Sequence, residues 1–378
     1  MFKTFPIFIG LSIIAGAASA QTSNVRFTAN LYQQLKGAEG NLFFSPYSAS
    51  QALRIAAEGA GGVTKKEFEA VLGAPPKELQ AHAIEWNESN RFWIRKDLKL
   101  SADYQKNVRE KLKADVVPLD FAAHPQKARE TINDEVAKQT KDRIKDLIPK
   151  EKDLSGMVSI LTNAVYFKAP WAQDFSPEAT QELPFQTLDG KKTTAKMMHN
   201  LKSVPYGEDA KSQWLSLDYG SSQSARFTLI LPRKGVDFRK FEASLDEASL
   251  QKILGNASTE TVEYALPKFT FASDHQLTPA LKSMGLKNAF TPGADFKAMF
   301  DPKASVPLYL SEVIQKAWIE VNEKGTEAAA ATAVYAVGGA ARPKPNKVLR
   351  ADRPFLFVIS GKTNGEDVIL FMGRVLKP

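Results

Sequence analysis

The segment from about residue 324 to residue 349 limits most strongly what this chain can fold into. Its alanine run, residues 328–331, would by itself favour a helix. The second half, however, reads Gly338-Gly339-Ala340-Ala341-Arg342-Pro343-Lys344-Pro345, and glycine and proline interrupt helices and strands alike. Connections longer than about 12–15 residues are usually functional or disordered. We therefore expect a long loop between two strands, and we expect this loop to carry the function.

Ordinary helices and strands surround this loop. Runs rich in β-forming residues predict strands over 158–167, 227–231, 354–359 and 368–375, with a hairpin turn at Thr363-Asn364-Gly365. Ser45-Pro46 predicts a helix start, and apolar periodicity predicts further helices over 129–148 and 276–286. No internal repeat or flexible linker divides the chain. The sequence indicates one mixed α+β domain over residues 21–378.

The first twenty residues are typical of a signal peptide. Lys3 precedes an apolar stretch over 5–17, and Ala18-Ser19-Ala20 is a cleavage site that would leave Gln21 as the mature N-terminus. The stretch is too short for a comfortable membrane span, so we expect a secreted or periplasmic protein and no membrane partner. The chain has no cysteine, which excludes disulfides and thiol chemistry. Export without cysteine favours a bacterial source.

Composition and motifs argue against several other functions. The net charge of +8 is spread along the chain without a dense basic run, so no nucleic-acid partner is expected. The four histidines lie far apart, and neither a Gly-x-Ser-x-Gly nor a His-Glu-x-x-His motif is present. We therefore predict no enzymatic activity, no metal and no cofactor.

Several motifs resemble, in order, those of the serpin family. The segment Glu323 to Thr332 resembles the hinge of an inhibitory serpin's reactive-centre loop. Further matches are found at 41–48, 161–171, 266–269, 293–295, 353–357 and 371–375. The chain is thus identified as a member of this family over essentially its whole mature length. The resemblance implies the serpin fold, in which a large central mixed sheet, further sheets and surrounding helices present an exposed loop.

The resemblance also implies a function. In inhibitory serpins a target serine protease cleaves the loop and stays covalently attached while the loop enters the central sheet as a new strand, an established case of strand addition and released strain. A single chain suffices, so a monomer is expected. The implied hinge residues are Glu323, Gly325, Thr326, Glu327, Ala328, Ala329, Ala330, Ala331 and Thr332.

The loop itself is suited to such insertion. Side chains alternate between the two faces of a strand, and the face beginning at Thr326 carries only small or β-branched residues as far as Gly338. The other face has one charge, Glu327, near the end that would enter first. A buried charge would cost several kcal/mol. The alternative, a non-inhibitory serpin with a binding or chaperone role, predicts misfits here, and the loop has none.

The position of cleavage follows from spacing and chemistry. The family's spacing from Glu323 implies a cut between Gly339 and Ala340, whereas counting back from Pro354 points near Pro343. Arg342 resembles a trypsin site, but the following proline disfavours cleavage. Less favoured positions are Val337, Ala341 and Arg342. Small residues at the cut predict elastase-like or subtilisin-like targets.

The resemblance further implies a region where the central strands part. It contains Ser45, Ser48 and Asn163, with Gln315 where the family usually has histidine. Trp171 is expected where the loop enters, and Lys268 is expected to pair with Glu323. Trp171 could instead be a plain core residue, and the ion pair a surface one worth under about 1 kcal/mol. The segment 74–90 is short against the family pattern, so polysaccharide activation is not predicted.

Overall fold

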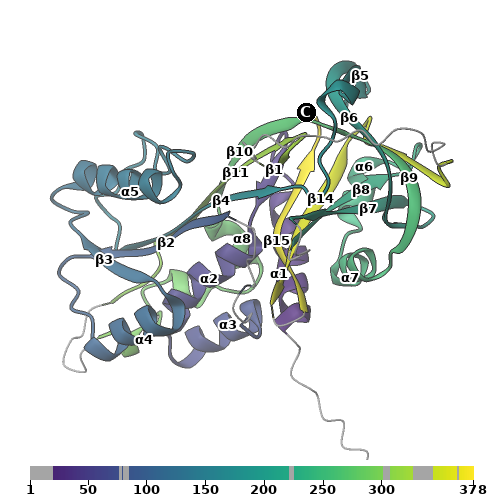
Figure 1. Ribbon diagram of the computed structural model, residues 1–378. Coiled ribbons are helices and arrows are strands. Elements are labelled where there is room, and N and C mark those ends of the chain that lie inside the picture. The colour runs from purple at the N-terminus through teal and green to yellow at the C-terminus, as the bar shows by residue number, and fades with distance from the viewer. Residues whose placement is uncertain are drawn as a thin grey trace, which may run out of the picture.

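The computed structural model describes residues 20–75, 79, 85–220, 225–300, 307–326, 344–363 and 366–378. Over these residues the chain forms two β-sheets with helices packed around them (Figure 1). The six-stranded sheet has the order β10 (Phe269–Gln276), β11 (Glu312–Asn322), β12 (Gly325–Thr326), β4 (Ser159–Pro170), β2 (Glu85–Arg95) and β3 (Asp115–Leu119). Strand β11 also pairs directly with β4.

The second sheet has nine strands within the described residues. Its order is β1 (Leu42–Phe44), β15 (Glu366–Val375), β14 (Phe355–Thr363), β8 (Ala225–Pro232), β7 (Ser212–Tyr219), β6 (Lys192–Glu208), β9 (Ser258–Pro267) and β13 (Lys347–Arg350), while β5 (Gln181–Gln186) pairs with β6. The mixed α+β serpin fold predicted from the sequence is therefore present.

Helices cover both faces of the six-stranded sheet. Figure 1 shows α5 (Pro125–Gln139) on one side of β2, with α2 (Pro46–Ala57), α3 (Gly62–Leu72), α4 (Ala102–Leu112) and α8 (Thr278–Ser283) on the other. Helix α1 (Ala20–Leu35) packs on β15 of the nine-stranded sheet. Helices α6 (Phe238–Ala243) and α7 (Glu247–Gly255) lie beside the same sheet. None of the helices in the described ranges is long and apolar enough to cross a membrane.

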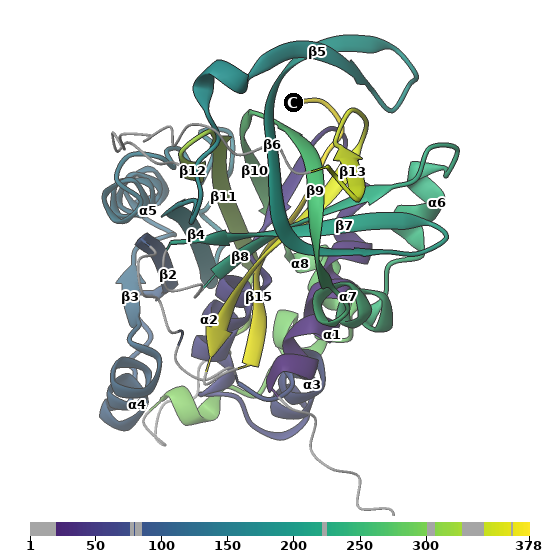
Figure 2. The same ribbon diagram turned by 45° about the vertical axis from the view of Figure 1, so that its right-hand side comes forward.

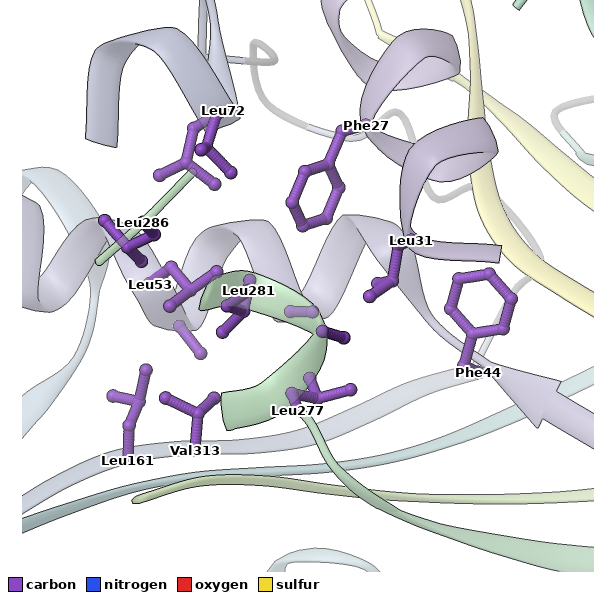
Figure 3. Close-up of a cluster of buried hydrophobic side chains, with 14 of the residues drawn as sticks. Phe27, Leu31, Phe44, Leu53, Leu72, Leu161, Leu277, Leu281, Leu286 and Val313 are labelled. Carbon is purple, nitrogen blue, oxygen red and sulfur yellow. The ribbon is translucent and has the colours of Figure 1, made fainter. Parts of the chain in front are cut away.

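Helix α2 forms the centre of the core. The Ser45 side chain accepts a hydrogen bond from the Ser48 backbone N–H, and Pro46 occupies the first turn, as the sequence predicted. Leu53 of this helix is fully buried. Figure 3 shows it facing Leu161 of β4 and Val313 of β11, so the helix packs directly beneath these two strands.

The predicted elements are largely confirmed, with one correction. Strands β4, β8, β14 and β15 and helix α2 are present, and α8 is shorter than predicted. The prediction of a continuous helix over 129–148 is wrong, because α5 ends at Gln139. There the Thr140 hydroxyl bonds the Val136 carbonyl and receives the Ile144 N–H, and Lys141 and Asp142 adopt positive φ. The apolar residues after Gln139 keep their helical spacing although the backbone there is irregular. Periodicity alone therefore predicted a helix that is too long.

Candidate functional site: the seam between β11 and β4

The seam is the boundary along which the two central strands β11 and β4 meet. The strands pair directly along most of this boundary, and another strand separates them at one end. The two strands pair in parallel from Glu312↔Ile160 to Trp318↔Tyr166. Beyond this point β12 lies between them, antiparallel to both, with Thr326 opposite Val321 on one side and Ala169 on the other (Figure 2). Two predicted hinge residues, Gly325 and Thr326, therefore already lie between the two central strands as a short inner strand.

Gly325 is needed at this position for steric reasons. Its φ is +150°, a backbone conformation that residues with a side chain rarely adopt. A Cβ atom added here would lie 2.2 Å from the Ala169 carbonyl oxygen and 2.7 Å from the Pro170 Cα. Both neighbours are backbone atoms of β4 and cannot move aside easily. The close approach of β12 to β4 thus depends on glycine.

An aromatic pair holds the turn that leads into β12. Trp171 stacks on Tyr219 with ring centroids 4.6 Å apart and an interplanar angle of 8°. The Trp171 indole donates to the Asn322 carbonyl at 2.9 Å, and its backbone N–H donates to the Lys324 carbonyl at 3.0 Å. The Tyr219 hydroxyl bonds that of Thr326, which is fully buried. Trp171 is therefore a buried core residue that also contacts the hinge.

Glu323 anchors the same turn through charge. Its carboxylate lies 2.7 Å from Lys268 Nζ and accepts from the Thr180 hydroxyl at 2.9 Å. Burial acts to raise the pKa of Glu323, but the bonds from Lys268 and Thr180 outweigh it, so the pKa lies below its usual range. The predicted ion pair is therefore present. Only 12% of the Glu323 side chain is exposed, whereas 35% of the Lys268 side chain is, so the pair as a whole is partly exposed.

A network of neutral side chains crosses the middle of the seam. The Gln315 amide of β11 donates to the Ser45 carbonyl at 2.9 Å and accepts from the Ser45 N–H at 3.0 Å. It also donates to the Asn163 side-chain oxygen of β4. Asn163 in turn donates to the Ser48 hydroxyl. The structure thus brings together the four residues assigned to this region, and the Gln315 amide both donates and accepts hydrogen bonds there.

Sequence reasoning missed two residues that extend this network, Asn90 and Glu88, and one residue beside it, His275. Asn90 of β2 accepts from Asn163, and Glu88 accepts from the Ser48 hydroxyl at 2.9 Å. Their spacing of two residues on one strand face was the available signal. His275 of β10 lies directly opposite Gln315, and its Nε2 is 3.0 Å from the Phe43 carbonyl oxygen. Burial lowers the pKa of His275, so the neutral ring is favoured beside the seam.

The remaining predicted site residues lie outside the described residues. These are Glu327, Ala328, Ala329, Ala330, Ala331 and Thr332 of the hinge, and Val337, Gly339, Ala340, Ala341 and Arg342 around the proposed cut. The chain is described again from Lys344, and β13 begins at Lys347 and pairs in parallel with β9. In the described ranges, no group of three or more side chains is suited to hold a metal ion.

The comparisons with known proteins agree with this architecture. The family model "Serpin (serine protease inhibitor)" matches residues 22–378, so the chain belongs to the serpin family. It is 35% identical to an uncharacterized serpin-like protein of Thermococcus kodakarensis, covering 93% of this chain and 84% of the relative. It is 33% identical to the leukocyte elastase inhibitor of Xenopus tropicalis, covering 93% and 97%. The native structure of the thermophilic serpin tengpin matches with a TM-score of 0.83 at 26% identity, covering 94% of each chain.

Proposed function

We propose that this protein inhibits serine proteases as a suicide substrate. The protease serine attacks the carbonyl carbon before the cut bond, the C–N bond breaks, and the amine leaves with a proton. The loop remains attached to the serine oxygen as an ester. Before water hydrolyses that ester, the loop enters between β11 and β4 and carries the protease with it.

The observation that carries this proposal is the position of β12. Its two residues pair antiparallel with a neighbour on each side, while the seam directly below them is closed. Continued insertion would replace one parallel pairing by two antiparallel ladders. The freed loop end would thereby gain backbone hydrogen bonds on both edges. Hinge and seam belong to one chain, so a monomer can perform the whole sequence.

The surroundings of the seam explain why the loop must be uncharged and small. Leu161 and Ala164 of β4 and Val313 and Ala317 of β11 are each at most 1% exposed. A strand inserted here would have its side chains among these residues, where an unpaired charge costs several kcal/mol. Residues 328–338 carry no charge, and all of them except Tyr335 are small or β-branched.

The proposed targets are elastase-like or subtilisin-like enzymes outside the cytoplasm. Gly339 and Ala340 are small enough for narrow primary pockets. A relative named leukocyte elastase inhibitor gives this choice further support. The signal-like first twenty residues support a secreted or periplasmic place of action.

Incubation with pancreatic elastase, followed by a denaturing gel, tests the proposal. The expected result is a band at the summed mass of the two proteins that survives boiling. Thr326→Arg should abolish this band and leave only cleaved protein, because a charge cannot enter the site that Thr326 fills. Thr326→Ser is the matched control and should keep the band. Cleavage without any complex in the unmutated protein would contradict inhibition of this class of protease.

A further inference from the structure

Helices α2, α3 and α4 enclose a hollow away from the seam. Figure 1 shows these three helices side by side below the six-stranded sheet. The hollow has a volume of about 370 Å³, within the range of small-molecule sites. Its apolar lining comes from Ala57 of α2, Phe68 and Leu72 of α3 and Leu112 of α4. Such a lining favours an apolar ligand body.

Arg54 of α2 contributes a partly buried positive charge to this hollow. Its Nη2 atom donates to the carbonyls of Leu72, Gly73 and Ala74 at 3.1–3.4 Å, which form the end of α3. Its Nε atom is buried and has no hydrogen-bond partner. No carboxylate of the described residues forms an ion pair with it, and burial lowers the pKa of Arg54 to about 10. The guanidinium is therefore charged at neutral pH and lacks a counterion.

Arg374 and Arg353 differ from Arg54 in this respect, whereas the Nε atom of Arg129 in α5 is likewise buried without a hydrogen-bond partner. Arg374 is fully buried, but its Nη1 lies 2.6 Å from the Glu242 carboxylate. The partly buried Arg353 is paired with Asp352 at 2.6 Å. A buried charge without a partner is costly. The bonds of Arg54 to the end of α3 account for one nitrogen only, which leaves donors for a further acceptor.

The rim of the hollow limits the charge that such an acceptor can carry. Lys65 and Lys111 join Arg54 as cations, and Glu58 and Glu69 are the carboxylates. Lys111 lies 3.0 Å from Glu58, so these two neutralise each other. One positive charge remains in excess. A singly charged anion fits this balance, whereas a polyanion would be repelled by the two carboxylates.

We propose that this hollow binds a monocarboxylate with an apolar body, its carboxylate on Arg54 and its chain against Phe68, Leu72 and Leu112. A carboxylate accepts charge-assisted hydrogen bonds from guanidinium groups, which are stronger than neutral ones. The ligand would supply the missing counterion and fill the apolar lining at the same time. This site is separate from the seam and does not depend on the proposed inhibition.

Calorimetric titration of the purified protein with octanoate tests this proposal. The expected result is saturable binding of one octanoate per chain, with clearly weaker binding of 1-octanol and of inorganic phosphate. Arg54→Gln should weaken binding about tenfold or more, because the amide can still donate to the α3 carbonyls but carries no charge. Arg226→Gln, which removes an arginine paired with Asp218 elsewhere, is the matched control and should bind normally.

A second variant keeps the test valid if Arg54→Gln fails to fold. Ala57→Phe places a ring in the hollow one helical turn from Arg54 and leaves the guanidinium intact. It should abolish octanoate binding without changing the melting temperature greatly. Absence of saturable octanoate binding, equal binding of 1-octanol, or unchanged affinity in Ala57→Phe would each overturn the proposal. In those cases Arg54 serves only to cap α3.

Discussion

The seam between β11 and β4 is stabilised by different contacts in its middle and at its end beside β12. In the middle, Gln315 and Asn163 connect the strands through neutral, fully buried amides. At the end beside β12, the Lys268–Glu323 ion pair holds the turn, and 35% of the Lys268 side chain is exposed. A buried polar group left without a partner costs about 1–3 kcal/mol, whereas exposed ion pairs contribute under about 1 kcal/mol.

The middle of the seam and its end beside β12 therefore have different roles. The middle holds the strands together through bonds that water cannot replace. The end beside β12 is held by a partly exposed ion pair and a short strand of two residues. Opening would therefore begin where the loop enters and would need the middle network to rearrange last. The following predictions disrupt the contacts of these two regions one at a time.

Gln315→Ala should have the larger effect. It leaves the Ser45 N–H and the Asn163 oxygen without their partner, and the Ser45 carbonyl keeps only the Ala49 N–H. We expect a loss of about 2–4 kcal/mol in the free energy of unfolding, measured by urea denaturation, together with faster polymerisation on a native gel. Gln315→His is the matched control and should lose less. Equal stability of Gln315→Ala and the unmutated protein would show that the hydrogen bonds of Gln315 do not hold the middle of the seam together.

Lys268→Gln should have the smaller effect, under about 1 kcal/mol near neutral pH. The ion pair lowers the pKa of Glu323, so it stabilises the fold above the unfolded pKa of about 4.3 and loses this contribution as pH falls through the folded pKa. The stability difference between Lys268→Gln and the unmutated protein should therefore shrink below about pH 4. Thermal unfolding at pH 7 and pH 3.5 measures it. A difference that grows in acid would contradict this reading.

The sequence predicted those parts of the molecule that local motifs specify. The Ser45-Pro46 helix start and the last hairpin each depend on residues close together in the chain. The Glu323–Lys268 pair and the Gln315 position came through family resemblance. The spacing of Glu88 and Asn90 shows only that they share a strand face. No local pattern could show that Asn90 lies opposite Asn163 or His275 opposite Gln315, because these strand pairings join distant segments.

Two further features show why the rest was inaccessible. The helix predicted over 129–148 failed because the Thr140 side chain competes for backbone bonds, an effect that apolar periodicity does not contain. No motif in the sequence singles out Arg54. Its isolation from carboxylates depends on how α2, α3 and α4 pack, which only the three-dimensional arrangement shows.

The melting temperature of the protein after cleavage within residues 327–343 tests the central claim most directly. Mass spectrometry would establish the cut, and the clipped and intact forms would be heated side by side. Insertion of the freed strand between β11 and β4 predicts a rise of at least about 10 °C, since each kcal/mol shifts the melting temperature of a mid-sized domain by about 2–4 °C. Thr326→Arg, once clipped, should show no rise. A clipped form that melts at or below the intact protein would contradict the account.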